Sequence, residues 1–184
     1  MPATQLIYSL NRLIMGYIPS GAKLTIWNEL YKRGAKPGLK NLEYFYEGKN
    51  PQKLKEFLPK LIKTVFAPTT WQQKEVSIKE NEYSVKWYMF KDLDNYTYFR
   101  VDIDLKIKHK GNKGTAKISL GEPVVVTEYP QETYWQKSFF YEILRVAWNN
   151  MFYAKKVKEY LDWGRLKISC FEEKLLKYFD YLGK

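Results

Sequence analysis

The chain alternates apolar and polar residues most regularly between residues 97 and 108. The apolar positions are Phe99, Val101, Ile103, Leu105 and Ile107, and the positions between them are charged. Side chains of a β-strand point alternately to opposite faces, so this period of two predicts a strand with one buried and one solvated face. Related patterns predict a meander with strands at about 73–80, 83–91, 96–109, 114–120 and 123–129.

Apolar residues spaced three and four positions apart predict the helices. The predicted helical ranges are about 4–17, 25–33, 51–66, 133–163 and 168–182. Pro59 lies in the middle of the third range, where proline removes a backbone donor and collides with the preceding turn, so we expect two short helices, 51–58 and 59–66. The long fourth helix is expected to end near Gly164, and residues 42–47 are predicted to form a further strand.

The helix predicted over 133–163 has two apolar sides. One arc, expected to face the sheet, consists of Gln136, Phe139, Ile143, Val146, Ala147, Asn150, Ala154, Val157 and Leu161. An opposite stripe of Tyr134, Tyr141, Trp148 and Phe152 is expected to be covered by the terminal helices. Asn150 is the polar exception on the sheet-facing arc. A buried amide without a partner costs ~1–3 kcal/mol, so a backbone carbonyl, a trapped water or a bound ligand is expected to satisfy it.

The order of these elements resembles the helix-grip fold of the START and Bet v 1-like superfamily. The resemblance is one of architecture, carried by Leu42–Glu47, Pro51–Phe66, Trp71–Tyr129 and Thr133–Trp163. It implies a curved sheet that grips the long helix around a cavity, which in that superfamily often holds an apolar or amphipathic molecule. No motif residue transfers, so the resemblance implies no catalytic residue. The chain differs from the superfamily in its N-terminal extension and in having five predicted strands, not six, after the paired helices.

Length and composition agree with this fold class. With 184 residues, of which 45% are hydrophobic and 17% aromatic, the chain is not a disordered protein. We expect an α+β fold, a curved antiparallel β-sheet packed on a long C-terminal helix, with additional N- and C-terminal helices. Residues 1–40 form the expected N-terminal helical extension, 41–164 the helix-grip-like domain, and 165–184 a C-terminal helix packed on the same domain.

Charge and cysteine content bear on partners and compartment. The chain has one cysteine, Cys170, no recognisable signal peptide and no apolar run of ~18 residues, which predicts a cytoplasmic location. The net charge of +11 is concentrated in residues 1–70, and only five of the 31 basic residues are arginine. Arginine is the side chain suited to bidentate phosphate and base recognition, so this charge permits an anionic partner without requiring one.

Groups that could perform catalysis or bind metal are few. His109 is the single histidine, which excludes a multi-histidine metal site. Asp102 and Asp104 share one strand face with Arg100 and Lys106, which favours ion pairing over metal binding. The sequence therefore predicts no catalytic residue, no metal and no cofactor, and favours a protein that is not an enzyme.

The sequence supports two hypotheses for the function. The first is a non-enzymatic binding protein that holds an apolar or amphipathic small molecule between sheet and long helix. Its predicted sheet wall is Trp87, Met89, Phe99, Val101 and Ile103, and its helix wall is Ile143, Ala147, Asn150 and Ala154. The alternative is a basic nucleic-acid- or ribonucleoprotein-associated accessory protein that uses Lys23, Lys32, Arg33, Lys36, Lys40, Lys53 and Lys60. Attachment to a membrane surface through helix 4–17 ranks below both, because that helix lacks a lysine-rich polar face.

Overall fold

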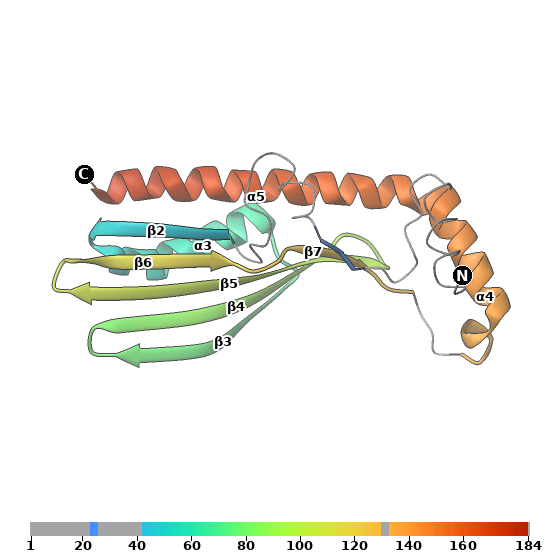
Figure 1. Ribbon diagram of the computed structural model, residues 1–184, viewed down its shortest axis with the longest axis horizontal. Helices are drawn as coiled ribbons and strands as arrows, with labels where there is room; N and C mark the ends of the chain where they lie inside the picture. Colours follow the sequence, from blue (N-terminus) through green and yellow to red (C-terminus); the bar gives the residue numbers. More distant parts are fainter. Residues whose placement is uncertain (1–22, 26–41, 130–132, 184) are drawn as a thin grey trace, which may run out of the picture.

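The computed structural model describes residues 23–25, 42–129 and 133–183 and contains one β-sheet and several helices (Figure 1). The strands are β1 (Lys23–Thr25), β2 (Leu42–Lys49), β3 (Thr70–Lys79), β4 (Glu82–Asp92), β5 (Thr97–Lys110), β6 (Lys113–Leu120) and β7 (Val124–Thr127). The helical elements are η2 (Pro51–Lys53), α3 (Leu54–Phe66), η3 (Trp135–Lys137), α4 (Phe139–Trp148), the π-helical η4 (Asn149–Tyr153) and α5 (Ala154–Gly183).

All the described strands belong to one antiparallel sheet centred on β5. One edge of β5 pairs with β4, and its other edge pairs with β6 over Ile103–Lys110 and with β7 over Thr97–Arg100. β3 extends the sheet beyond β4, while β2 and β1 add to β6 and β7. The predicted α+β fold, an antiparallel sheet with a long C-terminal helix, is confirmed, and each strand of the meander lies close to its predicted range.

The prediction that Pro59 divides the helix before the meander is wrong. One helix, α3, runs through Pro59 from Leu54 to Phe66. An interior proline costs about 3 kcal/mol in an isolated helix. Here that cost is offset because the inner face of α3 is buried over its whole length, with Leu54, Leu58, Leu61, Ile62, Val65 and Phe66 all inside the core.

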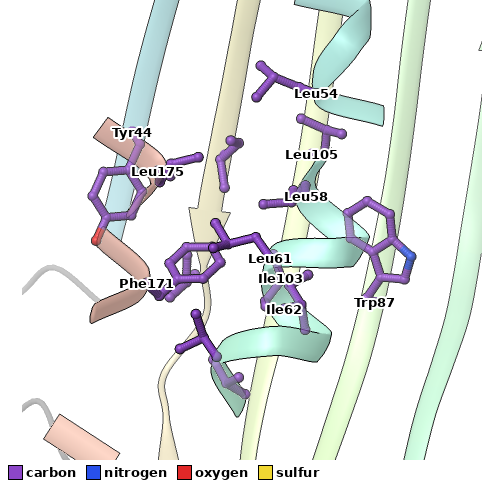
Figure 2. Packing of buried hydrophobic residues seen from close by; sticks show 14 of the residues in the cluster. Tyr44, Leu54, Leu58, Leu61, Ile62, Trp87, Ile103, Leu105, Phe171 and Leu175 are labelled. Atoms are coloured by element: carbon purple, nitrogen blue, oxygen red, sulfur yellow. The ribbon is translucent and has the colours of Figure 1, made fainter. Parts of the chain in front are cut away.

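The core lies on one face of the sheet, which α3 and α5 cover side by side (Figure 2). The buried face of the sheet includes Trp87, Met89, Phe99, Ile103 and Leu105, and α5 contributes Phe171, Leu175 and Phe179. Phe66 of α3 joins the layers, because its ring centroid lies 5.9 Å from that of Phe99 and 5.6 Å from that of Phe171.

The C-terminal helix is interrupted at a different place from the one predicted. α5 continues through Gly164 to Gly183, so the expected end near Gly164 and the separate helix 168–182 are both wrong. A helical glycine costs only about 1 kcal/mol, whereas continuation of the helix buries Ile168, Phe171 and Leu175. The interruption lies instead at η4, where α4 turns away from the direction of α5 (Figure 1).

Residues 1–22 and 26–41 lie outside the described residues, and so does the predicted helix 4–17. Of the range predicted to form a short helix from Thr25, only Thr25 is described, and it belongs to strand β1. Within the described ranges, no helix has the length and hydropathy needed to cross a lipid bilayer.

We predict that Phe66→Ala lowers the free energy of unfolding by about 3–5 kcal/mol, because it leaves a cavity where α3, β5 and α5 meet. Chemical denaturation monitored by circular dichroism measures this change. The matched control is Phe45→Ala on the opposite face of the sheet, where the ring is 68% exposed, and its effect should stay within about 0.5 kcal/mol. Equal effects of the two substitutions would contradict the described packing.

Candidate functional site

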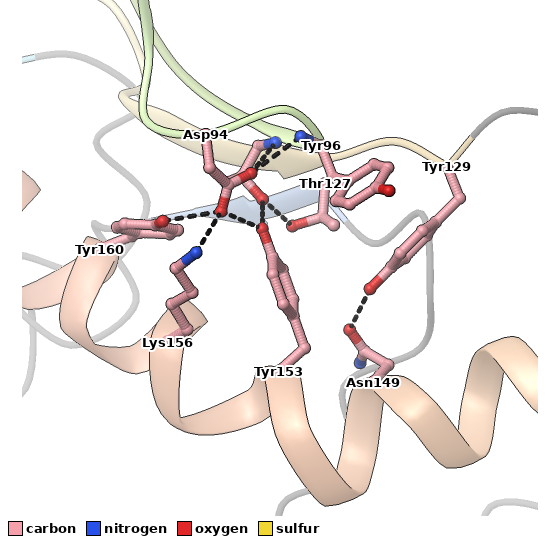
Figure 3. Close-up of polar contacts among 9 residues, drawn as sticks. Asp94, Tyr96, Thr127, Tyr129, Asn149, Tyr153, Lys156 and Tyr160 are labelled. Carbon is pink, nitrogen blue, oxygen red and sulfur yellow. Dashed lines mark hydrogen bonds and ion pairs between the residues drawn. The ribbon is translucent and has the colours of Figure 1, made fainter.

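A polar cluster lies where the turn between β4 and β5 and the end of β7 meet the junction of α4 with α5 (Figure 3). Its centre is the carboxylate of Asp94. One oxygen, Oδ1, accepts hydrogen bonds from the backbone N–H groups of Tyr96 at 2.8 Å and Thr97 at 2.9 Å. The other, Oδ2, accepts from the hydroxyls of Tyr153 at 2.5 Å and Tyr160 at 2.7 Å. Lys156 Nζ lies 3.3 Å from the same oxygen.

Further hydrogen bonds extend the cluster across β5 and β7. The Tyr153 hydroxyl lies 2.6 Å from Thr97 Oγ1, which lies 3.1 Å from Thr127 Oγ1, and both threonines are buried. After β7, the Tyr129 hydroxyl donates to Asn149 Oδ1 at 3.1 Å. These bonds fix the helix junction to two strands.

The protonation states of the cluster follow from these contacts. Burial opposes ionisation of Asp94, but the hydrogen bonds from Tyr153, Tyr160 and the Tyr96 amide outweigh it and lower the pKa to about 2. Burial and the hydrogen bond to the carboxylate raise the pKa of Tyr153. At neutral pH the carboxylate is therefore ionised and this phenol keeps its proton, so the pair fastens the junction and is not poised for acid–base catalysis.

The π-helical turn η4 rotates the helix so that Asn149 and Tyr153 both point into the cluster, where they are buried. In α4 the side that turns toward the body is also polar. Arg145, with only 10% of its side chain exposed, pairs with Glu142 at 2.5 Å and lies over the Tyr129 ring, 5.8 Å from its centroid. The side of α4 that faces the rest of the protein therefore carries the polar Glu142 and Arg145 beside half-buried Tyr141 and Val146.

The opposite side of α4 and η4 is apolar and exposed, and we call it the outer apolar face. It consists of Phe139, Phe140, Ile143, Leu144, Trp148, Met151 and Phe152, which are between 49% and 75% exposed. A surface helix ordinarily buries its apolar side and exposes its polar side, so α4 is inverted. A contiguous exposed apolar patch of this kind marks an interaction surface.

The predicted walls of the interior site are not brought together. The sheet-wall residues Trp87, Met89, Phe99, Val101 and Ile103 are fully buried under α3 and α5. The expectation that Ile143 and Ala147 face the sheet is wrong, because both are exposed on α4. Ala154 is half-buried at the start of α5. The physical reason is the π turn: residues before it no longer share a helix face with those after it.

Asn150 lies within that turn. Its side chain is partly buried, and its Oδ1 has no hydrogen-bond partner among the described residues. The neighbouring Asn149, which the sequence patterns did not single out, is the residue bonded to Tyr129.

The predicted lysine site is described only in part. Lys53 and Lys60 are exposed on η2 and α3, Lys23 belongs to β1, and the predicted positions Lys32, Arg33, Lys36 and Lys40 lie outside the described residues. On the outer face of the sheet, basic residues are paired with acidic ones, as in Arg100–Asp102 at 3.3 Å and Lys108–Glu82 at 2.8 Å. Within the described ranges no group of three or more His, Cys, Asp and Glu could hold a metal ion.

Two features of the site were not found from the sequence. The pattern around Asp94 predicts only a turn, since the tyrosines that bond to it lie about sixty residues further along the chain. The apolar stripe through Trp148 and Phe152 was expected to be covered by helices 4–17 and 168–182. The first lies outside the described residues, and the second is part of α5 and is buried in the main core. The adjacent apolar pairs Phe139–Phe140 and Ile143–Leu144 could have indicated the exposed face, because they make the apolar side of α4 wide.

No protein-family model and no curated protein matches the chain. Among solved structures it is similar to a protein of unknown function, SA2116 from Staphylococcus aureus, with 13% identity over 79% of this chain and 98% of that one, at a TM-score of 0.27. It is also similar to Ara h 8.0201, with 10% identity over 66% of this chain and 96% of that one, at a TM-score of 0.19. The fold description rests on this chain's own strand order and helices.

We predict that Asp94→Asn removes a pH-dependent part of the stability. The pKa of Asp94 is lower in the folded chain than its unfolded value of ~3.9, so the ionised group stabilises the fold fully above about pH 5, and this contribution is lost as the pH falls toward 2. Urea denaturation at pH 6 should show the variant less stable by on the order of 2 kcal/mol, and the difference should close toward pH 2. A difference that is the same at both pH values contradicts the role given to this carboxylate.

Proposed function

We propose that the protein is a non-enzymatic binding module for an apolar or amphipathic molecule, and that the outer apolar face of α4 is its contact surface. The observation that carries this proposal is the inversion of α4, whose polar side faces the body while Phe140, Leu144 and Trp148 are exposed. Full burial of such a side chain contributes about 1.5–3 kcal/mol, so seven of them on one face supply the driving force for association.

The Asp94 cluster supports this proposal because it fixes the surface before anything binds. Tyr153 and Asn149 hold the helix junction to β5 and to Tyr129 through buried hydrogen bonds. A site on a pre-ordered helix loses less conformational entropy on binding than a site on a loose segment.

We place the ligand on α4 and not between the sheet and α5. Leu58, Ile62 and Phe66 of α3 are buried over the predicted sheet wall, and side chains of α5 pack beside them. Among the described residues, the exposed apolar side chains are most concentrated on α4 and η4. A cytoplasmic location remains part of this proposal, on the strength of the single cysteine.

We predict that a fluorescent single-chain fatty acid binds the wild-type protein, and that the double variant Phe140→Ser/Leu144→Ser binds it at least about tenfold more weakly. Both side chains are exposed, so the thermal unfolding midpoint should be unchanged. The matched control is Phe45→Ser/Ile78→Ser, which removes two exposed apolar side chains from the sheet. If the two double variants bind alike, or if the wild type binds no fatty acid, the proposal is wrong.

Nucleic acid remains the alternative partner, supported by the exposed Lys53 and Lys60 and by the basic excess of residues 1–70. Counterion release would make such binding weaken steeply as salt rises from about 50 to about 200 mM. Fluorescence anisotropy with labelled single-stranded RNA and duplex DNA measures this dependence. An affinity that barely changes across this range would contradict the alternative.

A further inference from the structure

We infer that the occupant of the outer apolar face is the surface of an anionic lipid bilayer, with α4 lying in the plane of the membrane. The inference rests on the proposed function and names its partner. It differs from attachment through helix 4–17, because it assigns the contact to residues 139–152.

The dimensions of α4 suit this arrangement. The helix has 10 residues, which corresponds to a length of about 15 Å, half the ~30 Å thickness of the hydrocarbon core. It lies at one end of the molecule, beyond the sheet and turned away from α5 (Figure 1). A helix in this position can contact a flat surface while the sheet stays in water.

The side chains around this face are those favoured at the boundary between lipid and water. Trp148 lies within the face, and Tyr134 and Trp135, just before α4, are 94% and 58% exposed. Tryptophan and tyrosine are enriched at membrane interfaces because one end of each ring is apolar and the other is polar. Phenylalanine, leucine and tryptophan on one side of a short helix are typical of interfacial helices.

The charge around the face is complementary to anionic lipid. Residues 133–159 contain five basic side chains and two acidic side chains, Glu142 and Glu159, and are therefore net basic. Arg145 pairs with Glu142 and Lys156 with Asp94. The remaining three, Lys137, Lys155 and Lys158, are exposed at the two ends of the face and make no ion pair with any described residue. Each lysine near an anionic surface strengthens binding about fivefold.

The same charges argue against a second copy of the chain as occupant. A two-fold interface brings the same patch of both copies together. Lys137, Lys155 and Lys158 of one copy would then lie at the same interface as those of the other, where Glu142 is already paired with Arg145 and Glu159 alone would offset the three lysines. Like charges brought together in this way oppose association.

The test is flotation of the full-length protein with vesicles of phosphatidylcholine, alone or mixed with phosphatidylserine. We expect the wild type to float with the mixed vesicles, and Phe140→Ser/Leu144→Ser to lose flotation. The triple variant Lys137→Gln/Lys155→Gln/Lys158→Gln should bind the mixed vesicles at least about tenfold more weakly, since three charges are lost. The matched control, Lys53→Gln/Lys60→Gln/Lys110→Gln, removes three exposed lysines elsewhere and should float like the wild type.

Several results would overturn the inference. Flotation of Phe140→Ser/Leu144→Ser at the wild-type level would assign the contact to another part of the chain. Binding of the fatty acid without flotation would leave the proposed function standing while the inference fails, and absence of both would remove both. A concentration-dependent dimer in sedimentation, lost in the same double variant and without flotation, would identify a second copy as the occupant.

Discussion

The ionised carboxylate of Asp94 is the contact on which the arrangement of sheet and helix junction depends. Asp94 lies in the short turn between β4 and β5, and it contacts two tyrosines and a lysine of the C-terminal helical region. Because it also accepts two backbone N–H groups of its own turn, the turn and the helix are ordered by the same charge. α4 comes directly before the helix residues that contact Asp94, so its direction relative to the sheet depends on this contact.

The core and the proposed binding surface are separated by the π turn. On one side, α3 and α5 supply enough large side chains to fill the concave side of the sheet, with Phe66 in contact with both layers. On the other side, Arg145 and Asn149 both contact Tyr129 and hold the helix, so its apolar side is left outside. Among the described residues, the exposed apolar side chains are thus concentrated on the helix end, while the concave side of the sheet is filled.

This division also separates the two halves of the interior site that the sequence predicted. The sheet residues that were expected to form a ligand wall, such as Trp87 and Met89, are fully buried by protein side chains. The helix residues expected to oppose them, Ile143 and Ala147, point away from the sheet. The sheet half of the predicted site therefore belongs to the core, and Ile143 and Ala147 of its helix half are exposed on α4.

The sequence by itself determined β2, the strands of the meander and the α+β class, because alternation along β5 and the apolar spacing of α3 and α5 are local patterns that one burial direction explains. It did not predict β1, for which a helix beginning at Thr25 was expected. It did not determine where the long helix breaks, because a π turn has no apolar period of its own. It also did not show that helices continue through Pro59 and Gly164, because burial against distant residues offsets the local cost of these residues. The polar cluster was equally out of reach, because Asp94 and Tyr153 lie 59 residues apart and only the tertiary fold brings them together. Which side of α4 faces water was decided by tertiary contacts, because both sides of the helix carry apolar residues and Arg145 and Asn149 contact Tyr129 from one of them.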